Sequence, residues 1–443
     1  MEVDLHPEAE KRLSELGEEV FGSLERARPF PHGIEADGSW SHAPASTISA
    51  PLSWIEQTRD PFTKKHLRLE IHDKQHHLAL SKTGLDLFTR LVDRTAAQRG
   101  ISELASVEYI EERLTSWLQA RTNGSAEKWP AAIRSAIAKD CREWRVVIPL
   151  EGVQLQSPFT IGHVQFAFFT MAYFDGALPP GPPDATEEDR KRMRRHFEKY
   201  LGVVYAAFVC SAVPERAQER AVEEVEFVLG LLRFFDPAAV DARGLCLLGR
   251  RSAYERHEDH FFLEREGIIN ESISRLRYSV SPKLLEPGEL AFMMDLGLKR
   301  VDDLLRAPTR TPLEEQLLHS MVLFSSALVS PEIEHRLIYA LVSVESLFLK
   351  NDHEAITSNL ASRIARVARH ALPDRRSVVS DLRAVYDVRS RFIHHGERRG
   401  LETLELVNRS IQYCWDAIRN LLENTRWTTK DEMLRALDDE SLA

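Results

Sequence analysis

Residues 381–396 read DLRAVYDVRSRFIHHG and predict an amphipathic helix with one charged residue on its apolar face. Helical spacing brings to that face Leu382, Val385, Tyr386 and Ile393. Arg389 lies among these residues, four positions after Val385. Because burial of an unpaired charge costs several kcal/mol, we expect Arg389 either to meet a carboxylate or to line a cleft that receives an anion.

A second predicted helix, over about residues 332–350, contains a matching anomaly. Its apolar stripe consists of Leu337, Leu341, Val344 and Phe348. Glu345 lies beside this stripe, next to the apolar residues rather than opposite them. The two helices therefore predict an ion pair between Arg389 and Glu345.

From about residue 311 onward the pattern is almost entirely helical, with short breaks near 330–331, 351–352, 372–374 and 396–400. Short connections favour antiparallel neighbours, so residues 311–443 are predicted to form a helical bundle. The last long helix carries an apolar seam that consists of Leu404, Val407, Ile411, Cys414, Ile418 and Leu421. This seam predicts burial either in the chain's own core or against a second subunit.

Two histidines follow Arg389 near the predicted end of its helix. Five steps of about 100° place His394 about 140° around an ideal helix from Arg389. The two side chains would share a site if the helix ended near residue 394, where Gly396 favours a turn, or if a second subunit supplied the missing group. The sequence leaves both routes open.

The run from Tyr386 to Gly396 resembles the signature of the ApeA-like branch of HEPN domains, in which an arginine, a short spacer and a histidine follow one another. Residues 336–348 are similar to the first helix of that branch, including the acidic residue Glu345. The resemblance covers about 320–425. It implies a domain that forms a homodimer through the C-terminal bundle and builds an endoribonuclease site that needs no metal or other cofactor.

The resemblance implies a role for each residue of the motif. RNA supplies its own nucleophile, the 2′-hydroxyl, so the site has to steady the phosphate and move protons. Arg389 would bind the nonbridging oxygens, and His394 would exchange protons near neutral pH. Ser390 would donate a supporting hydrogen bond, beside Tyr386 and Glu345. The products would carry a 2′,3′-cyclic phosphate and a 5′-hydroxyl.

The identity of the histidine is open, because the family's spacing also accepts His395. We favour His394 as the catalytic residue and regard His395 as a supporting one. The alternative to a catalytic role for either histidine is purely structural. In that interpretation the helix end is capped, the histidines are solvated and the Arg389–Glu345 pair lies in the core.

Local charge is consistent with an RNA partner. Residues 361–400 contain ten arginines and four acidic residues, a net charge of +6 in a chain whose net charge is −10. Such asymmetry favours a local phosphate-binding patch over uniform binding to nucleic acid. The candidate RNA-binding residues are Arg383, Arg391, Arg398 and Arg399. An arginine-rich helix face that is merely solvated is the alternative.

The 443 residues predict two or three domains of an α+β protein. Residues 1–175 alternate between strand and helix patterns, with strands near 67–71 and 159–168 and helices near 83–98, 102–121 and 127–142. A Pro- and Gly-rich linker is predicted at 176–186. A largely helical middle is predicted at 187–310, beginning with a long helix that would carry Phe197, Leu201, Val204 and Phe208 on one face.

Several function classes are disfavoured. The four cysteines lie far apart, which fits a reducing cytoplasm, and neither a secretory leader nor a membrane-spanning segment is predicted. Phosphate-loop, dinucleotide-binding and metalloprotease motifs are absent from the sequence. The histidine groups at 72–77 and 257–260 lack convincing further ligands and are predicted to be surface residues.

The sequence thus predicts a bacterial anti-phage or toxin-like ribonuclease that acts by abortive infection. Residues 1–310 would then contain a sensor for a phage-derived trigger or a surface for an inhibitory partner. The alternative is a noncatalytic HEPN-type module that binds RNA or protein and whose Arg389–Glu345 pair is structural. That alternative predicts that loss of Arg389 lowers stability.

Overall fold

The computed structural model describes residues 4–26, 54–59, 66–72, 77–177, 186–239, 244–251, 258–265, 268–275, 283–350, 354, 356–369, 371–395 and 403–439. The chain has the predicted α+β fold and divides into two compact units. The first comprises 1–144 with 210–220, and the second comprises 145–209 with 221–443. The division therefore falls near residue 144 and not at the predicted linker, most of which lies outside the described residues.

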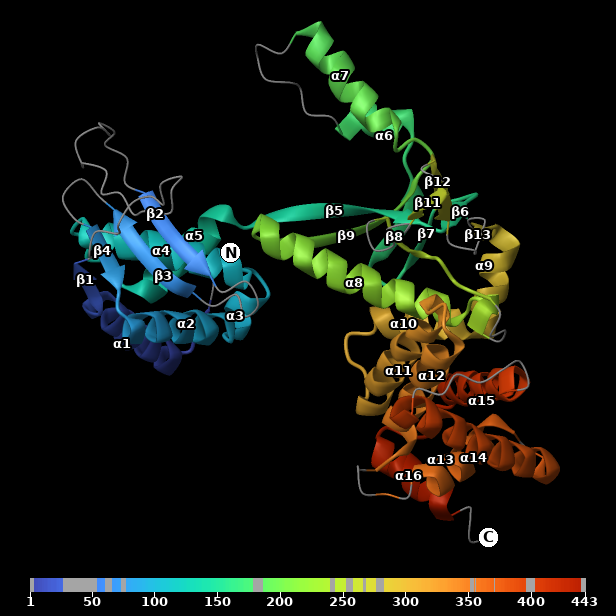
Figure 1. The fold of residues 1–443 in the computed structure, drawn as a ribbon. Coiled ribbons are helices and arrows are strands. Elements are labelled where there is room, and N and C mark those ends of the chain that lie inside the picture. Colours follow the sequence, from blue (N-terminus) through green and yellow to red (C-terminus); the bar gives the residue numbers. More distant parts are fainter. Residues whose placement is uncertain are drawn as a thin grey trace. The chain divides into compact units, whose positions relative to one another are not determined.

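The first unit packs helices against a small antiparallel sheet with strand order β1-β4-β3-β2 (Figure 1). The strands and helices are β1 (Leu24–Arg26), β2 (Trp54–Arg59), β3 (His66–His72), β4 (His77–Leu80), α1 (Pro7–Gly22), α2 (Lys82–Ala96), α3 (Arg99–Ser102), α4 (Val107–Thr122) and α5 (Trp129–Asp140). Trp129 is buried in the core, and its indole N–H donates to Thr95 Oγ1 at 3.0 Å. Gly17 lies so close to Trp129 that an added Cβ would be 3.1 Å from it.

The second unit begins with sheets. The largest has strand order β10-β5-β9-β8-β7. The elements before the bundle are β5 (Arg142–Glu151), β6 (Val153–Leu155), β7 (Phe159–Ile161), β8 (Val164–Phe168), α6 (Met171–Ala177), α7 (Glu187–Glu198), β9 (Val204–Ala212), α8 (Pro214–Phe234), η1 (Pro237–Ala239), β10 (Gly249–Arg250), β11 (Glu258–Arg265), β12 (Ile268–Arg275), β13 (Lys283–Leu285), α9 (Pro287–Met293), η2 (Met294–Leu298) and α10 (Lys299–Arg306). Among the described helices of the whole chain, none is long and apolar enough to cross a membrane.

The long helix predicted from residue 187 is wrong in its second half. Helix α7 ends at Glu198, and residues 204–212 form strand β9 instead. Gly202 has a φ of +75°, a conformation that ends the helix and that glycine adopts at little cost. In β9 the first five residues are all buried, as expected for a strand covered on both faces. The middle region consequently contains more strand than predicted.

The described elements of the C-terminal bundle are all helices, as predicted (Figure 1). Its helices are α11 (Pro312–Val329), α12 (Ile333–Phe348), α13 (Ile356–Ala368), α14 (Leu372–His395), α15 (Leu404–Glu423) and α16 (Lys430–Asp439). The predicted break at 372–374 is displaced, because Pro373 lies in the first turn of α14, where its missing N–H costs no helical hydrogen bond.

The apolar seam of α15 belongs to the chain's own core. Ile411, Cys414 and Ile418 are at most 2% exposed. Helix α15 packs against α12 and α13, and the indole N–H of Trp415 donates to the carbonyl of Phe234 in α8 at 2.8 Å. Of the two alternatives left open by the sequence, the chain's own core and a second subunit, the seam is therefore buried in the chain's own core.

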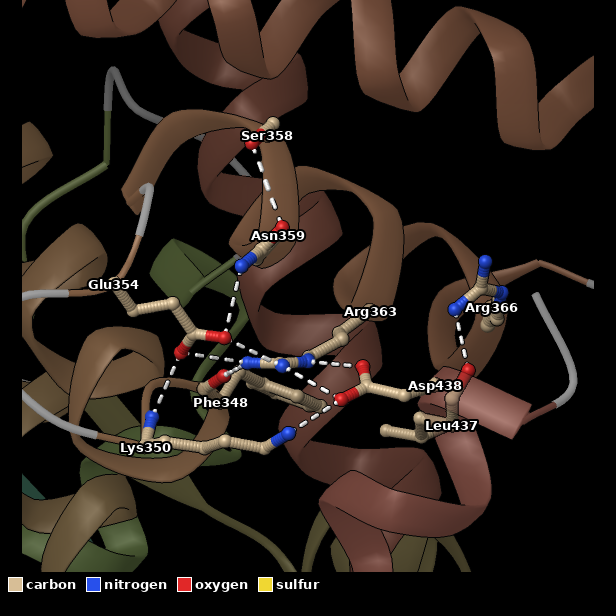
Figure 2. A network of polar contacts seen from close by, with 9 residues as sticks. All are labelled: Phe348, Lys350, Glu354, Ser358, Asn359, Arg363, Arg366, Leu437 and Asp438. Carbon is tan, nitrogen blue, oxygen red and sulfur yellow. Dashed lines mark hydrogen bonds and ion pairs between the residues drawn. The ribbon is translucent and has the colours of Figure 1, made fainter. Parts of the chain in front are cut away.

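One buried arginine ties α16 to the rest of the bundle (Figure 2). Arg363 in α13 is 2% exposed and lies between the carboxylates of Glu354 and Asp438. Its guanidinium makes two hydrogen bonds to each carboxylate, over 2.6–3.0 Å, and a fifth to the carbonyl of Phe348 at 2.6 Å. Lys350 adds an Nζ contact to Asp438 at 2.7 Å. The last helix is therefore held by charge as well as by apolar packing.

This cluster makes the bundle sensitive to acid. Burial alone would raise the pKa of Glu354, but hydrogen bonds from Arg363 and from the backbone N–H of Lys350 outweigh it and lower that pKa to about 2. Hydrogen bonds from Arg363 likewise lower the pKa of Asp438 to about 2 against the effect of burial. The pKa values of Glu354 and Asp438 are thus below their ordinary values of 4.5 and 3.8.

We expect the bundle to lose stability between about pH 4.5 and about pH 2. A carboxyl whose pKa is lower in the folded state stabilises the fold above its unfolded-state pKa, and that stabilisation is lost as the pH falls through the folded value. Urea unfolding at a series of pH values would show a midpoint that declines over this interval. In Arg363→Ala the decline should be shallower, and an equally steep decline would assign it to other groups.

Candidate functional site

The candidate site lies where α14 crosses α12. Tyr386 Oη donates a hydrogen bond to Glu345 Oε1 at 2.7 Å. Arg389 Nη2 lies 3.8 Å from the same oxygen, so the predicted Arg389–Glu345 pair is present. The guanidinium carbon of Arg389 is 5.7 Å from the centroid of the Tyr386 ring, within the range of a cation–π contact.

The floor of this cluster is buried. Burial, followed by the charge of Glu345, raises the pKa of the Tyr386 hydroxyl and that of the Cys414 thiol on α15. Both groups therefore stay protonated at neutral pH, and Cys414 is not a thiolate nucleophile. Tyr386 acts as a hydrogen-bond donor that orients Glu345.

Arg389 is held loosely compared with other arginines of the bundle. Its single ion pair is near the upper limit of such contacts, and its buried Nε atom has no hydrogen-bond partner among the described residues. By contrast, Arg363 makes five hydrogen bonds, and Arg369 pairs with Asp416 at 2.5 Å. With a side chain 27% exposed, Arg389 is accessible from solvent and has donor capacity left for an anion.

The structure does not bring His394 to Arg389 within one chain. Helix α14 ends at His395, close to the expected end near residue 394, but both histidines still belong to the helix and do not turn back toward Arg389. In a regular helix His394 lies about 140° and His395 about 120° around the axis from Arg389. Both imidazoles are exposed. Of the two routes to a shared site, a second subunit is the one compatible with this geometry.

The remaining predicted residues lie on the surface of α14 or beyond it. Ser390, Arg383 and Arg391 are exposed. Gly396 and the candidate RNA-binding residues Arg398 and Arg399 lie outside the described residues, as do the metal-ligand candidates His76 and His257. The described part of the motif thus presents separate basic side chains around the helix.

The predicted basic patch is smaller than the arginine count suggests. Arg363 and Arg369 are paired with carboxylates of the bundle, and Arg366 donates to the carbonyl of Leu437. Arg363 and Arg369 neutralise carboxylates of the bundle, and none of these three side chains belongs to α14. Only part of the net charge of +6 over 361–400 is therefore available at the surface of the bundle.

His335 is a residue near the site that the sequence did not single out. It lies on α12, where its ring centroid is 5.8 Å from that of Phe392 on α14. Its Nδ1 is 2.7 Å from a carboxylate oxygen of Glu332. Only the packing of α12 on α14 brings this imidazole near the motif, so no local pattern could have identified it.

Comparison of the chain with known protein families, curated proteins and solved structures finds no match. The resemblance to ApeA-like HEPN domains therefore stays a prediction from residues 320–425 of the sequence.

Proposed function

We propose that the chain is a metal-independent endoribonuclease of the HEPN type whose active site is completed by dimerisation. The observation that supports this best is the state of Arg389, an arginine on an otherwise apolar helix face with one long ion pair and an unpartnered Nε atom. A guanidinium that serves only the scaffold is normally satisfied by short hydrogen bonds. A phosphodiester at the exposed part of the Arg389 side chain would supply further acceptors.

In this proposal the two functional groups come from different subunits. Because Arg389 and His394 point away from each other on one helix, a twofold axis near α14 would place the arginine of one subunit beside the histidine of its partner. Arg389 would neutralise the charge that builds on the nonbridging oxygens. His394 would move the proton between the 2′-hydroxyl and the leaving oxygen.

The biological setting that we propose is bacterial defence against phage by abortive infection. In that setting cleavage of cellular RNA stops growth of the infected cell, and residues 1–310 would restrain the site until a phage-derived trigger arrives. This part of the proposal rests on the family resemblance alone.

The proposal is tested by RNA cleavage with histidine variants. Purified protein is incubated with single-stranded RNA in the presence of EDTA, and the product ends are analysed. We expect cleavage to persist in EDTA and to leave 2′,3′-cyclic phosphate ends. His394→Ala should lower the rate by about 10²–10⁴-fold, the usual contribution of a general acid or base.

His395→Ala is the matched control, since both histidines are exposed on the last turn of α14. It should lower the rate less than about tenfold, because a supporting residue moves no proton in the reaction. Absence of cleavage by the wild type, with and without phage challenge, would refute the enzyme. Equal losses in both histidine variants would refute the assignment to His394.

A noncatalytic binding module is the second candidate. It is favoured by the exposed histidines and by the Arg389–Glu345 pair, which a scaffold would also use. In that case the protein would bind RNA or a protein partner without cleaving RNA.

A further inference from the structure

A polar cavity of about 630 Å³ lies at one end of the bundle, where α15 ends and α14 begins. Its walls come from α13, α14, α15, α16 and the residues between α15 and α16. This volume is within the range of about 300–1,000 Å³ that small-molecule sites occupy. Along α14 the cavity residue Arg375 is 14 residues from Arg389, about 21 Å, so the two sites are separate.

The lining of the cavity is cationic. Arg366, Arg375 and Arg426 face a single acidic residue, Glu423. That carboxylate is already paired with Arg419 at 2.9 Å. The excess of positive charge in a concave site favours an anionic ligand.

Arg375 has donors to spare for such a ligand. Its Nε donates to the carbonyl of Arg369 at 3.0 Å, which fixes the side chain, and its Nη atoms have no partner in the described part of the chain. Arg366, which also lines the cavity, is anchored by a hydrogen bond to the carbonyl of Leu437. Guanidinium groups positioned in this way suit phosphate oxygens, which they bind through paired N–H donors.

The cavity also contains a flat aromatic surface. The Arg426 guanidinium carbon lies over the Trp427 ring, 4.0 Å from its centroid, in a cation–π contact. Asn420 is held by a hydrogen bond from its Nδ2 to the carbonyl of Val367 at 2.9 Å, which leaves its side-chain oxygen for a donor on a ligand. Aromatic rings and arginine planes are the groups on which nucleobases stack.

We propose that this cavity binds a nucleoside phosphate. The phosphates would contact Arg375 and Arg366, and the base would stack at Trp427. A simple inorganic anion would use the arginines and leave the indole without a role, so the aromatic wall favours a nucleotide. Binding at this end of the bundle requires neither Arg389 nor cleavage of RNA.

The test is calorimetric titration of the full-length protein with ATP, pyrophosphate and adenosine. We expect ATP to bind. Pyrophosphate, which has no base, and adenosine, which has no phosphate, should each bind at least about tenfold more weakly. Arg375→Gln should weaken ATP binding by about 10- to 100-fold, the value of a charge-assisted contact to phosphate.

Arg376→Gln is the matched control, because Arg376 is the next residue of α14, is exposed and does not line the cavity. Its effect on ATP binding should be less than about twofold. Trp427→Phe should preserve ATP binding, and Trp427→Leu should reduce it to the level of pyrophosphate. Thermal unfolding of each variant establishes that it is folded before titration.

Three results would overturn the proposal: no detectable binding of ATP to the wild type, pyrophosphate binding as tight as that of ATP, or equal losses in Arg375→Gln and Arg376→Gln. Because binding is measured directly, failure of this proposal is distinct from failure of the ribonuclease proposal.

Discussion

Arg363→Ala is expected to lower the free energy of unfolding by about 3–5 kcal/mol, the usual cost of breaking a buried ion pair by removing one partner. The substitution removes five hydrogen bonds and leaves Glu354, whose side chain is 10% exposed, without its arginine partner, while Asp438 keeps its contact with Lys350. The loss is measured by urea unfolding at neutral pH, followed by circular dichroism at helical wavelengths.

The contrast for this measurement is Arg409→Ala. Arg409 pairs with Asp381 at 2.9 Å, but its side chain is 48% exposed. Solvent screens such a pair, so its removal should cost at most about 1 kcal/mol. Similar losses for the two variants would mean that the Arg363 cluster is not the main polar support of the bundle.

Arg389→Ala is expected to lower RNA cleavage by about 10²–10³-fold, the effect of removing one donor that stabilises transition-state charge. The stability of this variant should change by less than about 1 kcal/mol, because the ion pair that Arg389 makes with Glu345 is 3.8 Å long and partly exposed. Cleavage assays and urea unfolding on the same preparation measure both effects. A loss of about 3 kcal/mol or more would instead identify Arg389 as scaffold and favour the binding module.

Mixing two inactive variants tests the shared site more directly. If each site takes Arg389 from one subunit and His394 from the other, a heterodimer of Arg389→Ala and His394→Ala retains one intact site. After random exchange of subunits, activity should recover to about a quarter of that of the wild type. No recovery, with exchange verified independently, would contradict a site divided in this way.

The ion pair between Arg389 and Glu345 could be predicted because one helix face carried the information. The position of Arg389 among apolar residues required an acidic partner, and Glu345 was the residue beside the stripe of the neighbouring helix. Arg389 and His394 both lie in α14, as predicted, and five residues of regular helix place them on different faces. The helix end was expected near residue 394, and α14 ends at His395 with both histidines still in the helix.

Other features depended on contacts between distant segments. Residues 204–212 have apolar residues that fit either a helix face or a buried strand, and pairing with β8 made them a strand. Arg363 and Asp438 are 75 residues apart in the chain, and no spacing rule connects them. The cavity beside Trp427 likewise exists only where several helix ends meet.

The sequence by itself determined the helices of the bundle, the α+β class and the need of Arg389 for an anionic partner, because periodicity and the cost of a buried charge act within a few turns of one helix. Only the tertiary structure decided that Arg363 is saturated while Arg389 keeps free donor capacity, and that the seam of α15 is internal. Two arginines of the same basic region receive different surroundings because the packing of remote segments determines which carboxylates reach each guanidinium.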